Sequence, residues 1–273
     1  MKTEHLERYT WDAWLAHVGQ PATVSPQSRQ SEWPDRDGFS QTATYAEALD
    51  LARKGWPEGL EQIRAQFTAI KAVLNVGDEM NSRLSDSGDD VEVGLFLDGD
   101  PEHWIEYPLM PKAHPVVKLI VSISASCGVS AETIFRKGAA IVAVVDGLEA
   151  SGVRCEIEAD HTVNASPSGK GNTYTNRIMV KRAEDSLDLD RIAFALCHPS
   201  MLRRLCFRTH ELGTDAEWER RGGKSYGYPE DPTPEPGAYV VPCASWSTPE
   251  WRTLEGAAAK AKAIIAELES AVV

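Results

Sequence analysis

The amino-acid sequence predicts an α/β protein: a mixed β-sheet flanked by helices, with an N-terminal helical segment. A continuous apolar and β-branched run, VVKLIVSIS at 116–124, is typical of a strand that is covered on both faces. An amphipathic helix and a second strand follow it within about 45 residues, which makes a βαβ unit. We therefore expect the two strands to run parallel and their crossover to be right-handed.

Composition excludes several other classes of protein. The chain has 273 residues, of which 42% are hydrophobic and 25% charged, so it is long enough to bury a core without disulfides and is neither a coiled coil nor wholly disordered. Its net charge of −13 disfavours a general affinity for nucleic acid or anionic lipid. The five cysteines are widely spread and form no CxxC pair, which favours reduced thiols in a cytoplasmic protein.

Residues 1–43 are predicted to be an extended arm. The first residues lack the apolar core of a signal peptide. The stretch at 21–39 is rich in Pro, Ser and charged residues, which is typical of a loop. Trp33 and Phe39 lie in this polar stretch, and we expect them to hold it against the core.

Residues 44–77 are predicted to be a pair of helices packed on the core. Thr44 and Glu47 have the spacing of a capping box at the start of the first helix. Gly55 can end that helix, and Pro57 fits the first turn of the next one.

Residues 78–273 are predicted to form the α/β domain. It begins with a polar loop at 78–90 and an alternating strand at 91–97. The βαβ unit follows, and Gly138 on the buried side of its helix should let that helix approach the sheet closely. The other expected elements are a strand at 177–183 that pairs with 153–159, a helix at 187–207 broken at Pro199, an excursion at 213–237, a strand at 238–244 and a helix ending near 270.

Ligands of doubly wound sheets bind beyond the carboxyl ends of the strands, and two segments fall there. Ser122, Ser124 and Ser126 recur at every second residue after the first strand, so their hydroxyls should point to one side. Asp160 and His161 end the next strand. These side chains form a candidate ligand site, and an ordinary polar strand end is the alternative.

A second candidate site is the cationic group around Arg203 and Arg204, which could hold a phosphate or carboxylate. Salt bridges to the abundant carboxylates are the alternative. No catalytic motif is present, so we assign no catalytic residue. A Cys127–His161 nucleophile is conceivable, although a buried thiol and a surface histidine explain the same residues.

The run from the serine-rich turn through GAAIVAVVDGLEASG to VRCEIEA resembles the first half of a von Willebrand factor A (vWA) domain, a Rossmann-like fold. Such domains carry D-x-S-x-S and bind Mg²⁺ there. In this chain Ser122 stands in place of the Asp, so we expect no cofactor; Ser124 and Ser126 are the positions that a weakly bound Mg²⁺ would use. By analogy with other such domains, the resemblance also implies a protein partner such as an AAA+ ATPase.

Two further segments, TATYAEALDLARKGWPEGLEQI and HPSMLRRLCFRTHE, resemble uncharacterised proteins of tailed phages. This resemblance implies a phage-encoded protein in the cytoplasm of the host cell. It carries no activity with it.

Our first functional hypothesis is a non-enzymatic protein that binds a host or phage protein, because catalytic motifs are absent and eight tryptophans offer anchors for an interface. The second is a small-ligand or nucleotide-binding protein, or an enzyme, with its site at the strand ends. The third is a nucleic-acid-associated accessory protein that uses Arg220, Arg221 and Lys224, against which nearby acidic residues argue. No membrane partner is expected.

Overall fold

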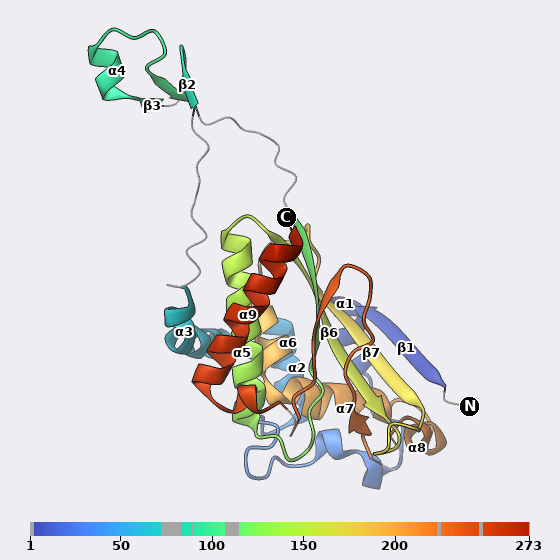
Figure 1. Ribbon diagram of the computed structural model, residues 1–273. Helices are drawn as coiled ribbons and strands as arrows, with labels where there is room; N and C mark the ends of the chain where they lie inside the picture. Colours follow the sequence, from blue (N-terminus) through green and yellow to red (C-terminus); the bar gives the residue numbers. More distant parts are fainter. Residues whose placement is uncertain are drawn as a thin grey trace. The chain divides into compact units, whose positions relative to one another are not determined.

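The computed structural model describes residues 3–71, 83–88, 90–106, 115–222, 225–245 and 248–272. The chain divides into two compact units, residues 1–74 with 115–273 and residues 75–114. Within the described residues, the larger unit is a mixed sheet flanked by helices, which confirms the predicted α/β class (Figure 1).

The sheet of the larger unit has the strand order β1-β7-β6-β5-β9, and β8 pairs with β6. Strand β5 runs parallel to both β6 and β9, as the βαβ prediction required, whereas β6 and β7 form an antiparallel hairpin. The strands are β1 (Glu4–Thr10), β5 (Val116–Ser122), β6 (Arg154–Asn164), β7 (Thr173–Lys181), β8 (Tyr228–Pro229) and β9 (Ala238–Val241). The carboxyl ends of β5, β6 and β9 therefore point toward one edge of the sheet.

Helices α5, α6 and α9 pack together and cover one face of the sheet (Figure 1). The apolar side chains of β5 at Val117, Leu119 and Val121 belong to the core on this face. The helices are α1 (Trp11–Val18), α2 (Tyr45–Lys54), α3 (Pro57–Lys71), α5 (Ala131–Ala150), α6 (Leu189–Cys197), the π-helix η3 (Met201–Cys206), α7 (Phe207–Glu211), α8 (Asp215–Gly222) and α9 (Leu254–Val272). Short 3-10 turns lie at Pro26–Ser28, Gln30–Glu32 and Pro249–Arg252.

Local signals explain several helix boundaries. The Thr44 hydroxyl accepts a hydrogen bond from the Glu47 amide at 3.1 Å and starts α2. Ser130 caps α5 in the same way through the Thr133 amide. Helix α6 ends at Cys197 because His198, which precedes a proline, is held in an extended conformation.

The N-terminal prediction is wrong for the first residues. Residues 4–10 form the edge strand β1, and α1 follows directly, so the extended arm begins only after α1. The segment EHLERYT has too few apolar residues to show a strand pattern, and its parallel pairing with β7 is a long-range contact. The arm of the folded protein is therefore residues 20–43.

The smaller unit, within residues 75–114, holds an antiparallel three-stranded sheet and a short helix. Its elements are β2 (Arg83–Ser85), β3 (Asp90–Val91), α4 (Val93–Leu97) and β4 (Trp104–Glu106). The predicted strand at 91–97 is wrong beyond Val91, because the Glu92 carboxylate accepts a hydrogen bond from the Leu95 amide at 2.8 Å and caps a helix. Of the predicted loop at 78–90, residues 78–82 and 89 lie outside the described part.

The closest packing of α5 is at Gly138, and its neighbour there is α6 and not the sheet. A Cβ atom on Gly138 would lie 2.2 Å from the Leu196 carbonyl oxygen and 2.7 Å from Cys197 Cα. The absence of a side chain therefore sets how closely α5 and α6 approach each other. The sequence predicted a close approach at Gly138, but it named the sheet as the neighbour where the structure has α6.

The Gly138→Ala variant should be less stable than the wild type by about 2 kcal/mol, because overpacking at the α5–α6 contact outweighs the better helix propensity of alanine. Urea unfolding followed by circular dichroism measures this difference. An unchanged or higher unfolding midpoint would show that the contact is not tight.

Candidate functional site

A cavity of about 360 Å³, here called the strand-end pocket, opens beyond the carboxyl end of β5. Its walls come from five segments that are far apart in the sequence. They are Ser124–Cys127 after β5, His161 and Val163 of β6, Leu202, Arg203 and Phe207 of η3 and α7, Gln30 and Phe39 of the arm, and Ser225–Pro229 around β8.

Four of the predicted site residues line this pocket: Ser124, Ser126, His161 and Arg203. Ser124 is buried, and its hydroxyl donates to the Thr162 carbonyl oxygen at 3.0 Å, which ties the end of β5 to β6. The parallel pairing of β5 and β6 brings the end of β5 beside Asp160, so that Ser124 and His161 lie near each other as the sequence predicted. The predicted strand end is wrong, however, because β6 continues to Asn164 and His161 lies inside it.

Ser122 is not among the residues that line the pocket. Its hydroxyl accepts a hydrogen bond from the Ser124 amide at 3.3 Å, and its carbonyl oxygen accepts one from the buried ammonium group of Lys137. Burial lowers the pKa of Lys137 to about 8. The prediction that all three serines share one ligand-facing side is therefore wrong for Ser122.

Asp160 also lies apart from the pocket, in an ion-pair network on the other face of the sheet from α5. Its carboxylate accepts hydrogen bonds from Arg177 at 2.9 Å and from the Thr162 hydroxyl at 2.6 Å. Burial raises the pKa of Asp160, and the bonds from Thr162 and Arg177 oppose that shift. The Arg177 guanidinium also bonds to Glu235, in the segment between β8 and β9.

The strand-end residues do not fit a Mg²⁺ ion. Magnesium prefers hard oxygen ligands and usually takes one or two carboxylates. No Asp or Glu is among the pocket-lining residues that the structure describes, and the nearby Asp160 carboxylate is bound by Arg177. Searched over the same described residues, the chain has no group of three His, Cys, Asp or Glu side chains with metal-binding geometry.

His161 presents an unsatisfied polar atom in this region. Its side chain is buried, and Nδ1 has no hydrogen-bond partner within the described structure. The ring centroid of His210 lies 5.5 Å away, and both nitrogens of His210 also lack partners there. Burial lowers the pKa of His161 to about 4 and that of His210 well below its usual value, so both rings are neutral at pH 7.

Arg203 and Arg204 donate to oxygen atoms of the protein, most of them in the arm. Arg203 donates to the carbonyl oxygens of Phe39 and Val129. Arg204 donates to the Thr42 hydroxyl at 2.7 Å and to three carbonyl oxygens, those of Ser31, Trp33 and Thr42. Neither arginine forms an ion pair among the described residues, so the salt-bridge alternative is wrong for these two; the binding of a phosphate or carboxylate stays a prediction.

A buried carboxylate, Glu211, completes the attachment of the arm. It accepts hydrogen bonds from the amide and hydroxyl of Ser31 and from the Tyr226 hydroxyl, and Arg208 lies 3.3 Å from it. Arg208 also donates to Glu32 at 2.6 Å and to the Gln20 carbonyl oxygen at 2.8 Å. The bond to Glu211 fixes the position of the Tyr226 side chain, which lines the strand-end pocket.

Aromatic rings form much of the pocket wall. Phe207 and Tyr226 stack with centroids 3.8 Å apart and an angle of 7° between their planes. The Arg203 guanidinium lies 4.0 Å from the ring centroid of Phe39. Phe207 was missed from the sequence because it falls at the end of a predicted helix. Tyr226 lies in the predicted excursion at 213–237, where an aromatic residue in a polar segment is the same signal that drew attention to Trp33 and Phe39.

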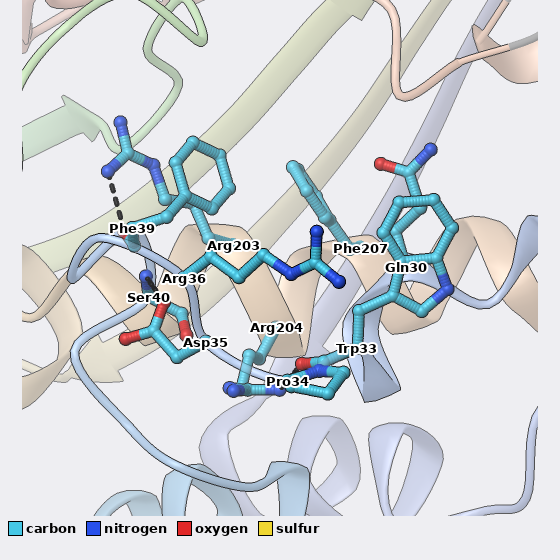
Figure 2. Close-up of a pocket in the computed structure, with 10 residues that line it drawn as sticks. All are labelled: Gln30, Trp33, Pro34, Asp35, Arg36, Phe39, Ser40, Arg203, Arg204 and Phe207. Atoms are coloured by element: carbon cyan, nitrogen blue, oxygen red, sulfur yellow. Dashed lines mark hydrogen bonds between the residues drawn. The ribbon is translucent and has the colours of Figure 1, made fainter.

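A second hollow, the arm groove, adjoins the strand-end pocket, with which it shares Gln30, Phe39, Arg203 and Phe207 (Figure 2). Its volume is about 670 Å³. Trp33, Pro34, Asp35, Arg36, Ser40 and Arg204 complete its lining. Arg204 therefore borders the arm groove and not the strand-end pocket.

The comparisons with known proteins give a family and no activity. The family model described as a domain of unknown function (DUF7192) matches residues 7–269. The chain belongs to this DUF7192 family. No curated protein and no solved structure matches it. None of the helices in the described residues is long and apolar enough to cross a bilayer.

The Arg204→Met variant should be about 3 kcal/mol less stable than the wild type, because it leaves several buried acceptors of the arm without donors. Chemical unfolding measures the loss, and limited proteolysis should show faster cleavage within the arm. Arg36→Met is the matched control, since Arg36 is exposed, and its effect should be below about 0.5 kcal/mol. Equal effects of the two variants would contradict this role of Arg204.

Stability should fall as the pH drops from 7.5 to 5. Burial lowers the pKa values of His161 and His198 from 6.5 to about 4, so the unfolded chain binds more protons than the folded chain over this range. The loss at pH 5 should be about 2 kcal/mol for each histidine. The free energy of unfolding in urea measures it; His161→Phe should flatten the pH dependence and His103→Phe, in the smaller unit, should not.

Proposed function

We propose that this member of the DUF7192 family binds a small ligand with a planar apolar part in the strand-end pocket. The observation that carries the proposal is the unpartnered imidazole nitrogen of His161, which is buried in a wall of an otherwise largely apolar pocket. A buried polar atom without a partner costs about 1–3 kcal/mol. Nδ1 is enclosed by protein, so a ligand relieves that cost when the imidazole ring turns this nitrogen toward the pocket that His161 lines.

The chemistry of the lining sets the class of ligand. No carboxylate is among the described lining residues, so a cationic ligand finds no counter-ion. Arg203, the cation of the lining, is only 3% exposed, donates to two carbonyl oxygens and lies over the Phe39 ring, so its guanidinium is held in the wall and is poorly accessible to an anion. Stacked rings and hydroxyls remain, which favours an uncharged heteroaromatic molecule. The volume is within the range of small-molecule pockets.

The residues of the strand-end pocket support ligand binding without catalysis. The Cys127 thiol is exposed and borders the pocket, but Nδ1 of His161 has no hydrogen-bond partner, Cys127 included, within the described residues. An enzyme that uses Cys127 as a nucleophile remains the alternative. Whether the protein only binds a ligand or is an enzyme, the rate of Cys127 alkylation reports whether the strand-end pocket is occupied.

Protein binding is the second candidate. Trp33 is 51% exposed and stands with Phe39 beside the arm groove, where two aromatic side chains could anchor a partner. A host or phage protein is the partner class that we propose, and an AAA+ ATPase within it rests on analogy alone. The phage-encoded, cytoplasmic setting is likewise a proposal that rests on the resemblance of two segments.

A panel of uncharged heteroaromatic compounds, namely adenosine, guanosine, indole and nicotinamide, tests ligand binding. At least one compound should raise the melting temperature by mass action and slow the alkylation of Cys127 by iodoacetamide. His161→Phe should abolish both effects, and His103→Phe should preserve them. If no compound changes either measurement, the ligand class is wrong; if His161→Phe binds as well as the wild type, the site is wrong.

A further inference from the structure

Strand β1 ends the sheet, and its outer edge has no partner strand among the described residues (Figure 1). Edge strands of this length can pair with another chain, and most are protected by a proline, a bulge or lysines. The segment EHLERYT has no proline and no lysine. Leu6, near its centre, is 51% exposed.

The hydrogen bonds to β7 show which groups of β1 face outward. The Thr173 amide donates to the Thr3 carbonyl oxygen at 3.0 Å, so the backbone of Thr3 faces β7. Because backbone groups alternate along a strand in a parallel pair, the N–H and C=O groups of Glu4, Leu6 and Arg8 face outward. An incoming antiparallel strand would pair with these three residues.

The charges along this edge are self-complementary about Leu6. We propose that β1 pairs antiparallel with β1 of a second copy of this chain, with Leu6 on the two-fold axis. Glu4 of each copy then lies opposite Arg8 of the other, and His5 lies opposite Glu7. Opposite charges across an antiparallel pair are favourable, and the two leucines cover each other.

Other registers are less favourable. Any other antiparallel register must still pair the outward N–H and C=O groups of the two strands, so the nearest alternatives shift one strand by two residues. These registers place His5 opposite His5 or Glu7 opposite Glu7. A parallel arrangement sets Glu4, Glu7 and Arg8 each against its own copy. The charges thus select one register, and its two-fold symmetry closes the assembly at two copies through this edge.

The contacts within one chain leave these side chains able to pair. Arg8 bonds to Glu158 and Glu235, yet its side chain remains 45% exposed. A guanidinium group has five N–H donors, so a further carboxylate can be bound. Glu4 and His5 are exposed. Glu7 is half-buried and accepts hydrogen bonds from the Tyr9 and Tyr174 hydroxyls through Oε2, so His5 of the second copy would be bound through Oε1. The proposal is independent of the strand-end pocket, whose lining contains no residue of β1.

Sedimentation velocity of the full chain over about 2–200 µM tests the association, since an interface this small should give a dissociation constant in the micromolar range. Leu6→Lys should raise that constant at least about tenfold, because two like charges meet at the axis. The matched control Leu84→Lys, at an exposed leucine of the smaller unit, should leave it unchanged. Equal melting temperatures exclude misfolding as the cause. A chain that stays monomeric throughout, or a Leu6→Lys variant that associates like the wild type, overturns the proposal.

Charge variants and a crosslink test the register. His5→Glu should weaken association because it faces Glu7, whereas His5→Lys should strengthen it. In a Cys127→Ser background, Leu6→Cys should form an intermolecular disulfide on mild oxidation, since opposite residues of a hydrogen-bonded pair have Cα atoms about 5.5 Å apart. Glu4→Cys should not crosslink, because the two copies of residue 4 would be about 13 Å apart. Crosslinking through residue 4 and not residue 6 contradicts this register.

Discussion

The attachment of the arm to η3 and α7 is the constraint on which the candidate site depends. The arm supplies Gln30 and Phe39 to the strand-end pocket, and it is held by the guanidinium groups of Arg203, Arg204 and Arg208. Burying a guanidinium is costly unless its donors are used. Here the backbone carbonyl groups of the arm, which has little regular secondary structure, accept hydrogen bonds from these guanidinium groups. The same bonds therefore offset the cost of burying the charges and provide partners for the arm backbone.

The strand-end pocket carries little charge although the protein is strongly acidic. The chain carries 41 acidic residues, yet none is among the described residues that line the strand-end pocket. Glu211 lies close behind the wall, where Ser31 and Tyr226 occupy its oxygens, and Asp160 is paired with Arg177. The carboxylates near the site thus serve to position other residues, which leaves a pocket of low charge in a strongly acidic protein.

The two buried histidines have different positions relative to the pocket. His161 borders it, while His210 lies behind, with Tyr174 at 5.0 Å and Tyr226 at 5.7 Å between ring centroids. Their low pKa values keep both rings neutral, so each offers one donor and one acceptor nitrogen. Neutral imidazoles suit recognition of an uncharged ligand better than attraction of an anion.

The sequence by itself determined the α/β class, the parallel β5–β6 pair, the helix cap at Thr44 and the break after His198, because each depends on local patterns or short-range bonds. It also predicted that Ser124, Ser126 and His161 lie together, because the parallel pairing places the end of β5 beside Asp160 of β6. Only the tertiary structure decided that β1 joins the sheet, that Asp160 belongs to Arg177, and that the arginines bind carbonyl groups. The pairing of β1 and the bonds of the arginines join residues more than 100 positions apart, and the pairing of Asp160 depends on which face of its strand is covered. Local sequence patterns indicate neither.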